Sequence, residues 1–280
     1  MKYLLLLIVF YSTSLKAQTD FNFNKRLIEC EDKWVVLPMN RDSTYTYGFI
    51  YLDNVAGLTF NLEGTFKIKG ETISNVQRQS MTNVIKKRLS PSNVKVAIVP
   101  ESKFKVLEVN PYPEWLKSYK TDSNSVERLF RLGFIYNMWN ECDKALIYLE
   151  KVKAANPNYN GLDFEFAFAY NALKQYDKAI VVLEEALKKS PKNCNLYKEL
   201  LYAEVNLDLL DKATATCKKG LLDCTDASIK MEMTYNLTYQ FFKKKNKEQF
   251  KYWATESKKY TVANDRYSKN IEEMEIELNK

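Results

Sequence analysis

Hydrophobic positions follow two patterns that divide the chain. From residue 126 onward apolar residues recur every three or four positions, as in amphipathic helices. Between residues 21 and 109 they fall in short runs that alternate with polar residues, as in strands. The chain is therefore predicted to be mainly α, with a helical C-terminal part preceded by a small β-rich (α+β) domain.

Runs rich in β-branched and aromatic residues predict an antiparallel meander in residues 21–109. The predicted strands span residues 34–37, 47–52, 58–62, 65–68 and 94–99. Asp53-Asn54 and Glu63-Gly64 are the expected turns between them. Residues 76–89 have loosely helical spacing, and a helix and a strand both stay open there.

The β-rich part carries an alternating aromatic face. Tyr45, Tyr47, Phe49 and Tyr51 point to one side of a predicted strand, where they form a core or stack on a ligand. The core interpretation is the commoner one for such a face. The other interpretation makes the chain a glycan- or peptidoglycan-binding accessory protein of the cell envelope, with Tyr47 and Tyr51 as contacts.

Residues 110–125 are expected to connect the two parts as a packed linker. Pro111 and Pro113 stiffen this segment, and Trp115 gives it an apolar ring to bury. Asn124 or Ser125 is the expected N-cap of the first long helix.

The helical pattern repeats every 34 residues. The first copy has Gly133 on its first helix and Pro157 at its end, and the second has Ala167 and Pro191 at the equivalent positions. A weaker third copy begins at Cys194. This period and spacing resemble the tetratricopeptide repeat (TPR) family, which implies a solenoid of three to four helix-turn-helix units. The expected units are residues 126–159, 160–193, 194–227 and a degenerate one at about 230–260, followed by a cap helix or tail at 261–280.

The resemblance implies a concave face, lined by the first helix of each unit, that holds a partner peptide or helix. The residues projected onto this face are Phe130, Phe134, Asn137, Phe164, Phe168, Asn171, Lys198 and Tyr202, with Phe241 and Phe242 in the last unit. Aromatic residues at these positions disfavour the basic clamp that some TPR domains use for acidic C-termini. An aromatic groove with asparagines for main-chain hydrogen bonds suits an apolar peptide or helix. The alternative is that neighbouring elements cover these rings.

The N-terminus has the pattern of a secretory signal. Met1–Ala17 has a basic start at Lys2 and then a leucine-rich apolar run that is short for a membrane span. We expect an exported protein of the bacterial periplasm or outer cell envelope, with no transmembrane segment after removal of the signal. The alternative is that this segment is an uncleaved anchor or a buried N-terminal element. Loss of Lys2 and Lys16 would lower the formal charge from +7 by two, to +5.

Composition argues against most catalytic chemistries. The chain has no histidine, which excludes histidine-dependent triads and removes a common metal ligand. Its seven glycines form none of the phosphate-binding loops. Basic and acidic residues are interleaved rather than gathered into a basic stripe, so no nucleic-acid partner is expected. We therefore predict a non-enzymatic, protein-binding scaffold without a cofactor or metal, and only acid-dependent catalysis remains as an enzymatic alternative.

The predicted export makes disulfides between the five cysteines possible, because disulfides persist in oxidising compartments. In a TPR unit the start of the first helix lies near the end of the second. The resemblance thus implies a disulfide between Cys194 and Cys224 in the third unit. The alternative is that both are small buried hydrophobic residues.

Overall fold

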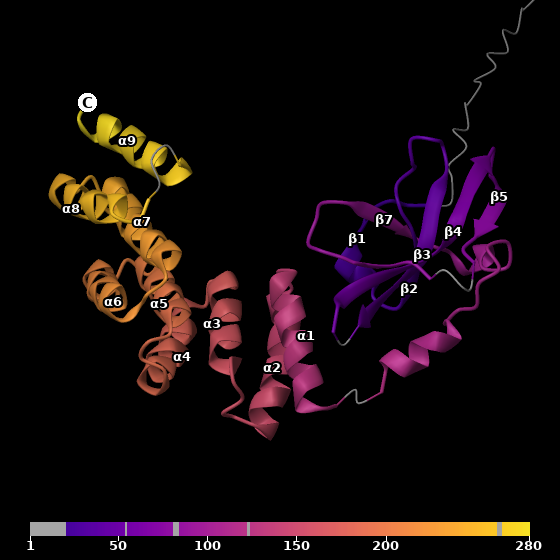
Figure 1. Cartoon of the computed structure of the whole chain (residues 1–280), viewed down its shortest axis with the longest axis horizontal. Coiled ribbons are helices and arrows are strands. Elements are labelled where there is room, and N and C mark those ends of the chain that lie inside the picture. The colour runs from indigo at the N-terminus through magenta and orange to yellow at the C-terminus, as the bar shows by residue number, and fades with distance from the viewer. Residues whose placement is uncertain (1–20, 54, 81–83, 122–123, 262–264) are drawn as a thin grey trace, which may run out of the picture. The chain divides into compact units, whose positions relative to one another are not determined.

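The computed structural model describes residues 21–280 except 54, 81–83, 122–123 and 262–264. The chain forms two compact units that divide between Thr121 and Asp122 (Figure 1). The first contains an antiparallel sheet and the second is helical, which confirms the predicted fold class. The predicted signal at residues 1–17 lies outside the described residues.

The sheet of the first unit has the strand order β1-β7-β2-β3-β4-β5, and β6 pairs with β4 beside β5. Every strand pairing in the described part is antiparallel. The strands are β1 (Lys25–Arg26), β2 (Lys33–Val36), β3 (Tyr45–Asp53), β4 (Gly57–Lys69), β5 (Thr72–Arg78), β6 (Lys86–Arg88) and β7 (Lys95–Ile98). Short 3-10 helices, η1 (Leu27–Cys30), η2 (Glu101–Lys103) and η3 (Glu114–Tyr119), complete the unit.

The predicted turn at Glu63-Gly64 is wrong, because β4 runs straight through it. Gly64 lies opposite Tyr47 on β3, next to the bulge at Tyr47/Gly48. A Cβ atom at Gly64 would lie 2.3 Å from the Gln77 carbonyl oxygen of β5. The glycine is needed for the close approach of two strands and not for a reversal of the chain.

The helical alternative for residues 76–89 is also wrong. This segment contributes the end of β5 and all of β6, and both strands pair with β4. Val84 and Ile85, which supported the helical spacing, are exposed. Their spacing therefore matched a helix without marking a buried face.

The aromatic face of β3 is the core of the first unit. Tyr47, Phe49 and Tyr51 are fully buried, which confirms the core interpretation. The sequence-based proposal that Tyr47 and Tyr51 contact a glycan is therefore wrong. Trp115 of η3 packs on this face, with its ring centroid 4.9 Å from that of Tyr51. The predicted linker up to Thr121 thus belongs to the sheet unit, and the domain extends beyond the predicted end at residue 109.

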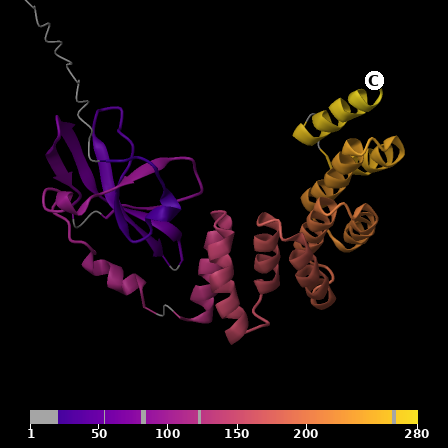
Figure 2. The same ribbon diagram turned by 180° about the vertical axis from the view of Figure 1, so that it is seen from behind.

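The second unit is a row of helical hairpins with a final helix (Figures 1 and 2). The helices are α1 (Val126–Met138), α2 (Cys142–Ala155), α3 (Leu162–Ala172), α4 (Tyr176–Lys189), α5 (Cys194–Asn206), α6 (Leu210–Asp223), α7 (Ala227–Lys243), α8 (Lys247–Lys258) and α9 (Arg266–Leu278). Within the described residues, no helix is both long and apolar enough to span a membrane.

Local sequence signals set the ends of these helices. The Ser125 hydroxyl accepts a hydrogen bond from the Arg128 N–H at 3.2 Å and caps α1. Helix α2 ends two residues before Pro157, and α4 ends two residues before Pro191. Proline disfavours the helical conformation of the residue before it, so each proline limits where the second helix of its hairpin ends.

Small residues allow the two helices of a hairpin to approach closely. A Cβ atom at Gly133 would lie 2.5 Å from Cδ2 of Leu149, so the leucine side chain occupies the space that a larger residue would need. Ala145, on the same helix as Leu149, is fully buried. The 34-residue pattern of small and large residues is thus a packing pattern.

All four hairpins turn through one left-handed residue, although the fourth has a weak sequence pattern. Asn140, Lys174 and Asp208 have φ of 57°, 59° and 62°, and Lys245 has φ of 54° in the fourth hairpin. In each turn the next N–H donates to a carbonyl five residues earlier, as in the 2.8 Å bond from residue 141 to 136 and the 3.0 Å bond from 246 to 241.

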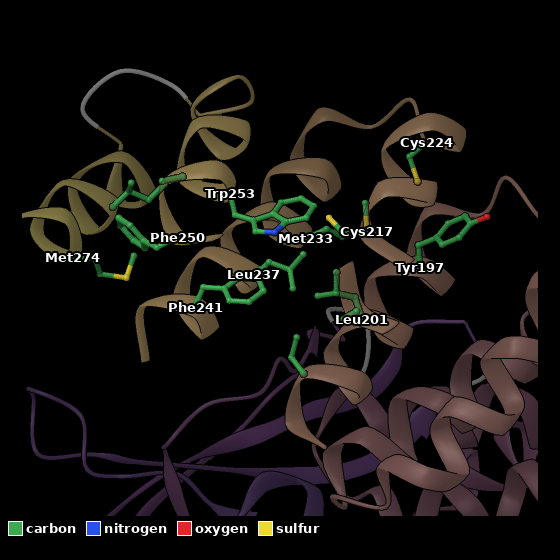
Figure 3. Packing of buried hydrophobic residues seen from close by; sticks show 14 residues of the cluster. Tyr197, Leu201, Cys217, Cys224, Met233, Leu237, Phe241, Phe250, Trp253 and Met274 are labelled. Carbon is green, nitrogen blue, oxygen red and sulfur yellow. The ribbon is translucent and has the colours of Figure 1, made fainter. Parts of the chain in front are cut away.

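The last hairpins and α9 share one apolar core. Figure 3 shows Trp253 of α8 close to Met233 of α7 and Cys217 of α6, with Leu237 beside them. Met274 of α9 belongs to the same cluster. The C-terminal helix thus covers apolar surface that the last hairpin would otherwise expose.

Candidate partner-binding face

The first helices of the hairpins form a continuous row. Helix α1 contacts α3, α3 contacts α5, and α5 contacts α7. Side chains at equivalent positions of these helices therefore lie along one surface, which we call the first-helix face. This is the face on which the TPR resemblance places a partner.

Three aromatic residues follow the first-helix face at intervals of 34 residues. Phe134 is 37% exposed and Tyr202 is 41% exposed, and Phe168 between them is half-buried. The Arg131 guanidinium lies 5.9 Å from the Phe134 ring centroid. We call Phe134, Phe168 and Tyr202 the aromatic row.

Tyr239 of α7 is a further exposed aromatic residue on a first helix, and sequence reasoning missed it. It is 43% exposed, comparable with Tyr202. Helix α7 has 17 residues, whereas α1 and α5 have 13. The 34-residue register cannot be carried over to this longer helix, so it did not point to Tyr239. The length of the apolar pattern in α7 was the sequence signal that could have indicated it.

Phe130 and Phe164 lie deeper than the aromatic row. Both are half-buried. The Phe130 ring packs against Tyr159, with centroids 4.7 Å apart, and Phe164 packs against the α3–α5 core. These rings contribute more to the packing beneath the first-helix face than to its exposed surface.

Asn137 and Asn171 do not offer hydrogen bonds to a partner, contrary to the sequence-based prediction. Each is 3% exposed. The Asn137 Nδ2 donates to the Glu165 carbonyl oxygen at 2.9 Å and to its carboxylate at 2.8 Å. The Asn171 Nδ2 makes the same two bonds to Glu199, at 3.1 and 2.9 Å. These residues link one repeat to the next.

This Asn–Glu link ends where the repeat degenerates. One period later the equivalent positions hold Val205 and Met233, and both belong to the apolar core of the last hairpins. A polar connection between neighbouring repeats is thus replaced by an apolar one. The Asn–Glu link needs both partners, since either one buried alone would be unpaired.

Two buried carboxyl groups on these helices, Glu165 and Glu204, have raised pKa values. Burial raises the pKa of Glu165, and the hydrogen bond from Asn137 partly opposes that rise. Glu204 stands where the first two repeats have Tyr136 and Tyr170, and burial raises its pKa to about 7. Its Oε2 atom is buried with no hydrogen-bond partner among the described residues.

Lys198 is half-buried on α5 and is not a free cation for an acidic ligand. Its Nζ lies 3.6 Å from a Glu199 carboxylate oxygen and 3.9 Å from one of Glu232. The charge of Lys198 is therefore compensated by neighbouring carboxylates.

Phe241 and Phe242, projected onto the same face, pack elsewhere. Phe241 is buried in the core of the last hairpins, and Phe242 is partly buried against it. Figure 3 shows Phe241 beside Leu237 in this core. Their assignment to the groove is therefore wrong.

Cys194 and Cys224 are neighbours in the third repeat and carry free thiols in this structure. Burial, followed by the hydrogen bond with the Cys194 thiol, raises the pKa of Cys224 to about 12. Cys194 begins α5 and Cys224 follows the last residue of α6. The disulfide between them stays a prediction.

The chain is similar in structure to several solved helical repeat proteins. A thermophilic TPR protein from Thermus thermophilus is 17% identical, with 58% of this chain and 87% of that chain covered at a TM-score of 0.46. MamA from Desulfovibrio magneticus is 18% identical, with 59% and 85% covered at 0.43. A tetratricopeptide repeat protein from Parabacteroides merdae is 12% identical, with 64% and 63% covered at 0.43.

No family model and no curated relative matches the chain. The helical unit has the fold of a TPR solenoid, as its 34-residue register, paired helices and repeated turns show.

Proposed function

We propose that the chain is an exported, non-enzymatic scaffold that binds a protein partner on the first-helix face. The single observation that supports partner binding on this face is the aromatic row, in which Phe134, Phe168 and Tyr202 stand 34 residues apart on helices that contact one another. Large aromatic residues are enriched among the residues that dominate binding energy at protein interfaces.

The contacts of the asparagines favour a helix over an extended peptide as the bound segment. An extended peptide leaves its main-chain groups to be satisfied by the receptor, and Asn137 and Asn171 are engaged with Glu165 and Glu199. A helix satisfies its own main chain and can place apolar side chains at intervals of three or four residues against a groove. We therefore propose an amphipathic helix of the partner, with its apolar side on the aromatic row.

The test is site-specific photocrosslinking in cells. A benzophenone amino acid replaces Tyr202, and crosslinked partners are compared in the otherwise native chain and in the Phe134→Ala, Phe168→Ala variant. The double variant should lose most of the crosslinked partner while its melting temperature falls little, because both rings are at least partly solvent-exposed.

Tyr252→Ala is the matched control. Tyr252 is exposed like Tyr202 but lies on α8, a second helix. Its replacement should leave crosslinking unchanged. A large fall in melting temperature for the double variant would show that the rings are core, and unchanged crosslinking with normal stability would contradict the binding face.

Export is the second part of the proposal, and it is supported by the basic and leucine-rich sequence of Met1–Ala17. Mass spectrometry of the protein from a fractionated bacterial host should find a periplasmic form that starts at about Gln18. A Leu6→Arg variant, which interrupts the apolar run, should stay in the cytoplasm with the N-terminal segment attached. Cytoplasmic accumulation of the unaltered chain would contradict export.

A further inference from the structure

The first unit contains a cavity of about 850 Å³ that the aromatic row does not involve. It lies beside the edge where β5 and β6 both pair with β4, and the segment leading into η3 forms its other wall. Its described lining includes Trp34, Asn61, Glu63, Arg78, Lys86 and Trp115. Such a volume is in the range of small-molecule sites.

Asn61 contributes to this cavity a buried polar atom that has no partner among the described residues. It is 4% exposed, and its Oδ1 atom is buried with no hydrogen-bond donor among the described residues. Asn61 pairs with Phe49 across the sheet, so its side chain is on the same face as the aromatic core. A buried amide oxygen is costly unless something donates to it, and a hydroxyl in the cavity would do so.

Charged residues that line the cavity with Asn61 form ion pairs or hydrogen bonds with neighbouring side chains. Arg78 contacts the Glu63 carboxylate and lies 3.7 Å from a Glu108 carboxylate oxygen. Glu108 has a φ of 53°, which is unfavourable for a residue with a side chain. Lys86 donates to the Tyr119 hydroxyl at 2.6 Å. These contacts place carboxylates and hydrogen-bond donors around the cavity.

The charge of the lining disfavours an anionic ligand. It has three carboxylates, Glu63, Glu108 and Glu114, against the two cations Arg78 and Lys86, which is a formal charge of −1. A phosphate or nucleotide site would show an excess of cations or free N–H groups.

The pairing of β4 disfavours a peptide that adds as a strand. β3 occupies one edge of β4, and β5 and β6 occupy the other. At this part of the sheet a peptide could add only at the outer edges of β5 and β6, and not on β4, which carries Asn61. The apolar part of the lining, which includes Trp115, and the polar groups beside it suit a neutral ligand with several hydroxyl groups.

We infer that this cavity binds a neutral saccharide, with a ligand hydroxyl donating to Asn61 Oδ1 and other hydroxyls meeting the Glu63–Arg78 pair. This site is distinct from the buried tyrosines of β3 and from the first-helix face. It gives the chain a small-molecule site in addition to its proposed protein partner.

The experiment is calorimetric titration of the full chain with maltose, cellobiose and N,N′-diacetylchitobiose, up to roughly 10 mM. Tryptophan emission is recorded in parallel, because Trp34 and Trp115 line the cavity. Asn61→Leu replaces the amide with an apolar group of similar size and should weaken binding by about tenfold or more. The variant should fold, since it removes an unpartnered polar atom from the interior.

Asn40→Leu is the matched control. Asn40 is an exposed residue of the same unit whose Nδ2 bonds to Thr44 and Thr46, and it does not line the cavity. Its replacement should leave saccharide affinity unchanged. The inference is overturned if none of the three disaccharides binds, if Asn61→Leu binds as well as the native chain, or if a dialanine or glucose 6-phosphate probe binds in preference.

Discussion

Glu204 offers a quantitative test of the packing of the third repeat. It is a buried carboxyl at the position that holds Tyr136 and Tyr170 in the first two repeats. Burial is the main reason that its pKa rises from 4.5 to about 7, and the nearby Glu184 adds to the rise. The test variant is Glu204→Gln, which keeps the shape of the side chain and removes its titratable carboxyl group.

The direction of the pH dependence of stability follows from the linkage between protonation and folding. The folded state binds the proton more tightly than the unfolded chain, so the stability from protonated Glu204 is fully present below about pH 4.5 and is lost as the pH rises to about 7. A rise of this size corresponds to roughly 3 kcal/mol as an upper bound. Above pH 7 the glutamine variant should therefore be more stable than the native chain by up to about that amount.

The assay is chemical unfolding at pH 5, 6, 7 and 8, followed by circular dichroism. The chain contains no histidine, so no histidine titration obscures this pH range. Glu150→Gln, an exposed change on α2, is the control and should give the native pH profile. A difference between native and Glu204→Gln chains that does not change with pH would refute the reasoning, as would a variant that is less stable at pH 8.

The other predictions concern the repeat and its turns. Asn171→Ala should cost about 1–3 kcal/mol in urea unfolding, because it leaves a buried carboxylate without its amide donor. Gly133→Ala should cost about 1–3 kcal/mol, since its methyl group meets Leu149, and should cost clearly less in a Leu149→Ala background. Lys174→Gly should raise the melting temperature, with a gain of up to about 1 kcal/mol from relief of its left-handed backbone, whereas Lys178→Gly within α4 should lower stability by about 1 kcal/mol. Equal effects of the two lysine changes would contradict the turn argument.

Helical periodicity predicted much of the second unit because its packing is local. Each hairpin is formed by segments adjacent in sequence, so the spacing of Gly133 and Leu149 and the positions of Pro157 and Pro191 carry most of the information. The fourth hairpin was harder to assign because its first helix is longer and its register shifts.

Orientation of side chains on the first helices could not be read from the same periodicity. A period marks one face of a helix but does not show how far the next repeat covers that face. Asn137 and Phe134 are both on α1, three residues apart, yet the asparagine is buried against Glu165 and the phenylalanine is exposed. Only the offset between successive hairpins separates them.

The first unit shows the same limit more strongly. Alternation predicted the strands and the aromatic core, since a half-buried strand repeats every two residues. The cavity, in contrast, joins residues from β2, β4, β5 and the segment before η3, which are far apart in the chain. Nothing near Asn61 in the sequence marks it as unpartnered.

The sequence by itself thus determined the helical repeat and the β-rich character of the first unit, because these depend on interactions between near neighbours. The tertiary structure decided which aromatic residues stay exposed, which asparagines link repeats, and which polar groups surround a cavity. Those properties depend on contacts between distant segments, and local periodicity does not reflect such contacts.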